Sequence, residues 1–240
     1  MKRLKLNNKG AALISVLVIT TFITILATTM LYVAATNFQQ KQTDYQNKQS
    51  FYGAEKALDE LKSILVKDVQ TAYVEAYNKT TRNFLRMDAA QREAYFQDVF
   101  MDTLKKTWDS RVASSGDLLG AVKSVMTGAY AAEADSFYKV MDYGIYETTD
   151  SGQTLQKFAL RGVQVKYTEG NFTTFLYTDI CLEPPAMDWS AESFSTSTEL
   201  VEREKIAFTD YVSYVNWRKA DYDDSNDGIY DSIDGLGTKK

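Results

Sequence analysis

The residues whose types and spacing best suit chemistry lie near the C-terminus of this 240-residue chain, in the acidic segment 223–234. Oxygen-bearing side chains occupy positions 1, 3, 5, 9 and 12 of that segment: Asp223, Ser225, Asp227, Asp231 and Asp234. Gly228 at position 6 allows a sharp turn, and Ile229 at position 7 offers a backbone carbonyl. Calcium takes six to eight hard oxygen ligands, so the spacing predicts a calcium loop with an extracellular-type affinity of about 10⁻⁴–10⁻³ M.

The ending of this segment resembles the calcium loops of EF-hand-like bacterial modules, such as thrombospondin type 3 repeats and dockerins. It departs from the EF-hand pattern at position 12, where Asp234 replaces the usual bidentate glutamate, and its flanks show no clear helix pair. The alternative interpretation is an acidic tail that binds no ion, because C-termini rich in Asp, Gly and Ser are often disordered.

Other side chains offer little for catalysis. The chain has no histidine, which removes the commonest general base and the commonest nitrogen ligand of metals. With a single cysteine, Cys181, the chain can form no intramolecular disulfide. Cys181 lies late in an apolar stretch, which predicts a core position. The 32 acidic residues form no distinctive pair for acid–base work, and the net charge of −5 argues against a nucleic-acid partner. We therefore expect no enzymatic activity; a membrane-tethered enzyme is the least favoured alternative.

The N-terminus carries the pattern of a membrane helix. Four of the first ten residues are basic and none is acidic, and no charge occurs from Ala11 to Ala35. These 25 residues would form a helix of about 37 Å, which is enough to cross the ~30 Å core of a bilayer. The basic flank predicts that residues 1–9 stay in the cytoplasm and that the rest lies outside. The apolar run is too long for an ordinary secretory signal peptide, but a plain signal anchor fits the hydropathy equally well.

Two motifs favour a more specific interpretation. A short basic leader ends at Lys9-Gly10 directly before Ala11 and the apolar helix, and the stretch Phe51–Glu60 reads FYGAEKALDE. Together they resemble the class III leader of prepilins and the conserved helix stretch of PilX-like minor pilins. The resemblance covers about residues 1–65 and implies that a prepilin peptidase cuts between Gly10 and Ala11.

Two departures from the pilin pattern refine this expectation. Major pilins carry glutamate at the fifth position after the cut and often proline at the twenty-second, which are here Ser15 and Tyr32. The resemblance therefore implies a minor subunit with a tip or priming role, because the topmost subunit has no upper neighbour whose amine it must meet. We expect Ser15 and the threonines of the apolar run to bond back to helix carbonyls and to favour close packing against other pilin helices.

Periodicity predicts the remaining elements. The apolar residues at helical spacing mark one face of a helix that continues to about residue 66: Ala54, Ala57, Leu58, Leu61, Ile64 and Leu65. Gly53 in that helix is interpreted as a flexing point. Further helices are expected at 88–108, capped by Asp88 with Gln91, and at 117–141, capped by Asp117.

Alternation and turn residues then predict an antiparallel meander with strands at 144–149, 154–168 and 171–182. Pro184-Pro185 ends it, residues 189–198 are expected to form a surface loop, and 201–217 fits a strand slightly better than a helix. The expected fold is α+β and pilin-like: a long N-terminal transmembrane helix extends into a head of further helices followed by an antiparallel β-sheet.

These expectations combine into one organisation: a leader (1–10), a transmembrane and filament-core helix (11–35), its extension (36–66), an extracellular head (67–220) and an acidic tail (221–240). The resemblance implies a minor subunit of a type IV pilus or a type II-like pseudopilus, with other pilin subunits, the prepilin peptidase, the pilus assembly platform and the membrane as partners. The precursor would be a single-pass protein of the cytoplasmic membrane, and the mature chain would reach the cell surface in the filament. The alternative is a signal-anchored extracellular binding or adhesion protein outside any filament.

Overall fold

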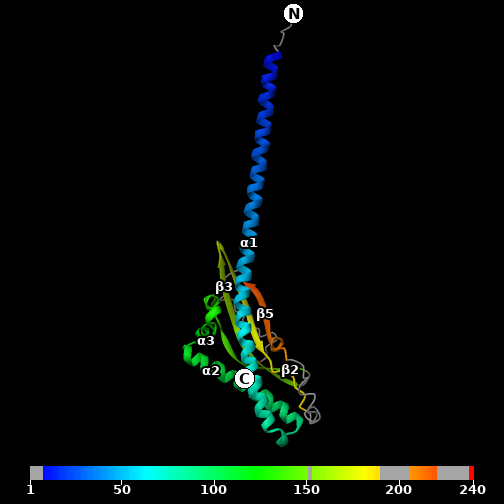
Figure 1. The fold of residues 1–240 in the computed structure, drawn as a ribbon, viewed down its shortest axis with the longest axis vertical. Coiled ribbons are helices and arrows are strands. Elements are labelled where there is room, and N and C mark those ends of the chain that lie inside the picture. Colours follow the sequence, from blue (N-terminus) through cyan, green and yellow to red (C-terminus); the bar gives the residue numbers. More distant parts are fainter. Residues whose placement is uncertain (1–7, 151–152, 190–205, 221–237) are drawn as a thin grey trace, which may run out of the picture. The chain divides into compact units, whose positions relative to one another are not determined.

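A computed structural model of the chain describes residues 8–150, 153–189, 206–220 and 238–240 (Figure 1). The contacts divide the chain into two compact units, an N-terminal unit of residues 1–48 and a head unit of residues 49–240. Helix α1 (Asn8–Arg82) contributes residues to both units.

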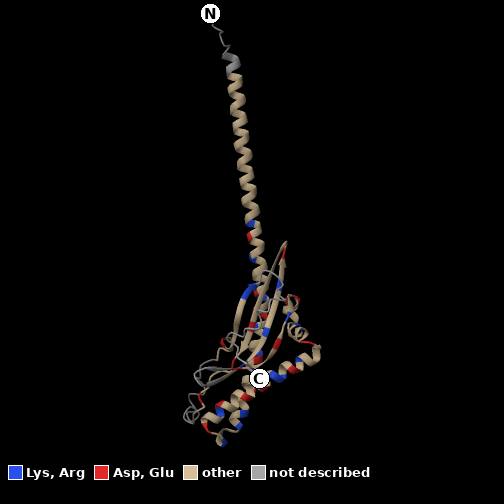
Figure 2. Cartoon of the chain, turned by 180° about the vertical axis from the view of Figure 1, so that it is seen from behind, with Lys and Arg blue, Asp and Glu red and all other residues tan. Residues whose placement is uncertain are grey.

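The N-terminal unit consists of the first part of α1. Every side chain from residue 12 to residue 35 is exposed to solvent, and most of these side chains are apolar. No charged residue occurs in the helix between Lys9 and Lys41, so the ribbon shows no blue or red along this stretch (Figure 2). By length and composition α1 is long and apolar enough to cross a membrane.

In the head unit, α1 continues to Arg82, well beyond the predicted end at residue 66. The apolar face persists through Val69, Ala72 and Ala76, all of them buried, and no proline interrupts it. A short 3₁₀ turn, η1 (Phe84–Arg86), then leads out of the helix.

Helix α2 (Ala89–Ser115) confirms the predicted capping box, since the Asp88 side chain accepts from the Gln91 N–H and the Gln91 side chain accepts from the Asp88 N–H. Gly116 closes the helix in the left-handed conformation, with φ of 87°. The shorter helix α3 (Leu118–Val125) is capped by Asp117, as predicted.

The prediction of one helix over 117–141 is wrong beyond Val125. Gly128 adopts a positive φ of 67°, and three short elements follow: η2 (Gly128–Tyr130), α4 (Ala131–Ala134) and strand β1 (Phe137–Lys139). Phe137 is fully buried and pairs with Val165, so a non-local strand pairing overrides the local helix propensity of the alanine-rich stretch.

The sheet confirms the predicted meander. The strand predicted over 201–217 is confirmed only in part, because it begins at Val212 and the described residues 206–211 before it form no strand. Its strands are β2 (Asp142–Asp150), β3 (Gln153–Glu169), β4 (Phe172–Leu182), β5 (Val212–Ala220) and β6 (Thr238–Lys239). They are ordered β5-β4-β3-β2-β6, all neighbouring pairs are antiparallel, and β1 pairs with β3. A 3₁₀ turn, η4 (Phe208–Tyr211), precedes β5.

One apolar core joins the second part of α1 to α2, α3 and one face of the sheet. Figure 1 shows the cyan part of α1 lying along the sheet, and a buried hydrogen bond of 2.7 Å joins Ser50 of α1 to Thr174 of β4. Burying the apolar face of α1 against the sheet supplies the main stabilisation of the head unit.

The structure corrects the prediction that a surface loop begins at Trp189. The Trp189 indole is buried and packs against Phe96 of α2, with 5.3 Å between ring centroids. The Arg92 guanidinium donates to the Trp189 carbonyl at 2.8 Å and to the Phe84 carbonyl at 3.0 Å. The predicted loop positions from 190 to 198 lie outside the described residues.

Candidate functional site

The two predicted processing residues lie at the start of the membrane-type helix. Helix α1 begins at Asn8, so Gly10 and Ala11 are both within its first turn. The predicted cleavage point therefore lies directly before the exposed apolar part of α1, where a cut would leave that whole part attached to the mature chain.

Five threonine hydroxyls in the exposed apolar part confirm the back-bonding expected for them. The Thr20, Thr21, Thr24, Thr28 and Thr29 hydroxyls each donate to the carbonyl three or four residues earlier, at 2.6–3.0 Å. Each of these donors is therefore satisfied within its own helix, which makes threonine tolerable in lipid. The exposed surface that remains is apolar and would require a bilayer or partner helices to cover it.

The stretch Phe51–Glu60 lies where α1 packs on the sheet. Ala54, Ala57 and Leu58 are fully buried, and the two alanines let the helix backbone approach the strands closely. Gly53 allows the closest approach, because a Cβ atom there would lie 2.5 Å from the Tyr167 ring of β3. The interpretation of Gly53 as a flexing point is therefore replaced: the glycine is a packing position within a regular helix.

The polar residues of the same stretch make tertiary contacts on either side of this packing face. Lys56 forms an ion pair with Glu133 of α4, and the Tyr214 hydroxyl of β5 donates to Asp59 at 3.2 Å. Burial, together with the nearby Asp59 and Glu55 carboxylates, raises the pKa of the Tyr214 phenol. This phenol therefore stays protonated and remains a hydrogen-bond donor at neutral pH.

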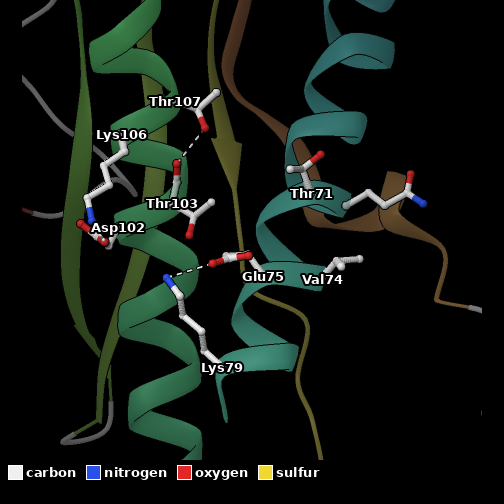
Figure 3. Close-up of a pocket in the computed structure, with 9 residues that line it drawn as sticks. Thr71, Val74, Glu75, Lys79, Asp102, Thr103, Lys106 and Thr107 are labelled. Carbon is white, nitrogen blue, oxygen red and sulfur yellow. Dashed lines mark hydrogen bonds and ion pairs between the residues drawn. The ribbon is translucent and has the colours of Figure 1, made fainter. Parts of the chain in front are cut away.

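A groove of about 650 Å³ lies between α1 and α2 in the head unit (Figure 3). Its charged side chains are paired within their own helices, Lys79 with Glu75 at 3.0 Å and Lys106 with Asp102. The threonine hydroxyls that line it all donate to carbonyls one turn earlier in their own helix: Thr71, Thr103 and Thr107. None of the groove residues therefore offers an activated nucleophile or an unpaired charge for chemistry.

Cys181 is a core residue, as predicted from the sequence. It packs with Tyr146 and Ala159 on the face of the sheet away from α1. Burial raises the pKa of its thiol to about 12, so the thiolate needed for reactivity does not form at neutral pH.

The six predicted calcium ligands all lie outside the described residues: Asp223, Ser225, Asp227, Ile229, Asp231 and Asp234. Within the described part of the chain, no group of three or more Cys, Asp and Glu side chains could hold a metal ion. The calcium loop accordingly stays a prediction from sequence.

Comparison with known proteins leaves the sequence and the geometry as the only guides to function. No protein-family model, curated protein or solved structure matches this chain.

Proposed function

We propose that this chain is a minor structural subunit of a type IV pilus or a type II-like pseudopilus, assembled through its N-terminal helix after removal of residues 1–10. One observation carries the proposal: the same helix, α1, has an exposed, uncharged apolar part and a part that packs on the sheet of an α+β head. Such a helix can first span the membrane and then pack with other helices in a filament, with its head outside the cell.

The details of the apolar part support a minor role. Ser15 stands where the pilin pattern has glutamate, so the chain brings no carboxylate to meet the N-terminal amine of a neighbouring subunit. A subunit at the tip, or one that primes assembly, has no neighbour above it and does not require that carboxylate. The partners of this proposal are other pilin subunits, the prepilin peptidase, the assembly platform and the membrane.

Photo-crosslinking in cells tests whether the apolar part bundles with other pilin helices. A benzophenone amino acid at position 22, where Phe22 is exposed, should give adducts with other chains whose precursors carry prepilin leaders. These adducts should disappear when the assembly ATPase is deleted. The control position is Leu85, which is 96% exposed in the head unit and should give none of these helix adducts.

Adducts to lipid alone from position 22, unchanged by loss of the ATPase, would instead identify a signal-anchored surface protein. That alternative shares the membrane helix and lacks only the filament partners.

We also propose that the acidic segment 223–234 binds calcium, on the spacing of its oxygen ligands. Calcium at about 10 mM should slow proteolysis within this segment by at least about tenfold relative to chelator, because an ion that binds only the ordered loop stabilises it. The cleavage sites are read by mass spectrometry. The double variant Asp223→Ala/Asp227→Ala should lose the protection. Equal cleavage of the wild type with calcium and with chelator would contradict calcium binding by this segment.

A further inference from the structure

A small concavity on the head unit combines aromatic rings with carboxylates. It has a volume of about 280 Å³ and lies between α1 and β5, lined by Glu55, Leu58, Asp59, Tyr214 and Trp217. We call it the α1–β5 concavity. Aromatic faces and carboxylates share one preference, which is for a positively charged group.

An irregularity in β5 brings the two rings to the same side of the sheet. Side chains three residues apart in a regular strand point to opposite faces. In β5 two residues, Asn216 and Trp217, stand opposite a single residue of β4, and Asn216 has a positive φ of 57°. This bulge turns Trp217 to the α1 side, where Tyr214 already lies, and its indole meets the Phe51 ring edge-on at 5.9 Å between centroids.

A buried carboxylate in the neighbouring strand holds the bulge in place. Asp179 of β4 is only 2% exposed and accepts from the Asn216 side-chain amide at 2.8 Å. The same carboxylate accepts from the Gly162 N–H of β3 at 2.6 Å. The placement of Trp217 is therefore fixed by the sheet before any ligand arrives, which reduces the entropy lost on binding.

Two carboxylates make one side of the concavity acidic. Glu55 and Asp59 lie one turn apart on α1, where like charges repel each other. Neither carboxylate forms an ion pair with another described residue, although Asp59 accepts the Tyr214 hydroxyl. Lys62 is near but its ammonium lies against the Tyr214 ring, 5.2 Å from the centroid. A bound cation would relieve the repulsion between the two carboxylates.

We propose that the α1–β5 concavity binds the ammonium group of a lysine side chain presented by another protein. A primary ammonium has three N–H donors for the Glu55 and Asp59 carboxylates, and its methylene stem can lie along Leu58 and the Trp217 ring. A quaternary ammonium has no N–H donor and would use the rings alone. The proposal does not depend on filament assembly.

The three tryptophans of the chain make Trp217 a usable reporter. Trp108 and Trp189 are 0% and 2% exposed, whereas Trp217 is 43% exposed and lines the concavity. The full-length chain in a maltoside detergent would be titrated with n-butylammonium chloride, the side chain of lysine without its backbone, at constant ionic strength. We expect a saturable change in tryptophan fluorescence with a Kd in the millimolar range, a weaker response to tetramethylammonium, and no saturable response to the neutral 1-butanol.

Two variants with the same change in charge make the test specific. Glu55→Gln should weaken butylammonium binding by about fivefold, because one of the two facing carboxylates is lost. Glu60→Gln lies on the same helix outside the concavity and should bind as the wild type does. Circular dichroism would verify that both variants fold.

Three results would overturn the proposal: a fluorescence change that does not saturate, an equal response to 1-butanol, or unchanged binding in Glu55→Gln. Tighter binding of tetramethylammonium than of butylammonium would overturn the assignment to lysine, because it would show that the rings select a quaternary ammonium.

Discussion

The variant Asp179→Ala is expected to lower the free energy of unfolding of the head unit by about 3 kcal/mol, because three hydrogen-bond donors lose a buried charged acceptor. The donors are the Gly162 N–H, the Tyr177 hydroxyl and the Asn216 amide, at 2.6, 3.2 and 2.8 Å from the carboxylate. Alanine leaves them facing a small void in a region with little access to water. For a chain of this size such a loss should lower the thermal midpoint by about 6–12 °C, measured in detergent by near-ultraviolet circular dichroism.

Two further variants separate this effect from a simple loss of charge. Asp179→Asn keeps one oxygen for the Gly162 N–H but sets an amide against the Asn216 amide, so we expect an intermediate loss. Asp135→Ala removes an exposed carboxylate and should change stability by less than about 0.5 kcal/mol. If Asp179→Ala were no less stable than Asp135→Ala, the buried carboxylate would not be what holds the bulge of β5.

The variant Gly53→Val is expected to destabilise the head unit by about 2–3 kcal/mol through overpacking against β3. A Cβ atom at this position would lie 2.5 Å from Cδ1 and 2.7 Å from Cγ of Tyr167. Because Cγ lies near the base of the Tyr167 side chain, a change of rotamer at the ring end alone cannot clear the space. The measurement is again the thermal midpoint of the full-length chain in detergent.

A double variant identifies the cause of this loss. Gly53→Val/Tyr167→Ala should recover part of the stability lost in Gly53→Val, whereas Tyr167→Ala alone should destabilise the otherwise unchanged chain. Ser63→Val introduces the same residue at an exposed position of α1 and reports the helix propensity alone. Additive effects of the two changes would contradict direct packing of Gly53 on Tyr167.

Local patterns were sufficient to predict the elements that local interactions determine. The Asp88–Gln91 capping box and the meander of β2, β3 and β4 follow from spacing, alternation and turn residues, and the structure confirms them. The α+β composition with a long apolar N-terminal helix also agrees with the expectation.

The remaining differences depend on contacts between distant residues. Alanine-rich residues 128–135 favour a longer helix, but Phe137 is better buried as a strand residue opposite Val165. Trp189 follows a proline pair and precedes a polar stretch, yet Phe96 and Arg92 hold it in the core. Such choices are made by tertiary packing and leave no periodic signal in the sequence.

The candidate functional features likewise divide into those that depend on neighbours in one helix and those that depend on distant residues. The apolar helix and its satisfied threonines could be predicted because both depend only on neighbours along one helix. The α1–β5 concavity could not, because it requires the bulge at Asn216, and that bulge depends on Asp179 in another strand. Strand β6 is only two residues long and carries too little pattern to be recognised.

The most direct test of the proposed function is the N-terminus of the mature protein, determined by mass spectrometry in cells with and without the prepilin peptidase. A chain that starts at Ala11 only when the peptidase is present, with or without N-methylation, is the result that the proposal predicts. An intact Met1 in both strains, or a start beyond Ala35, would contradict it and leave an anchored or secreted surface protein.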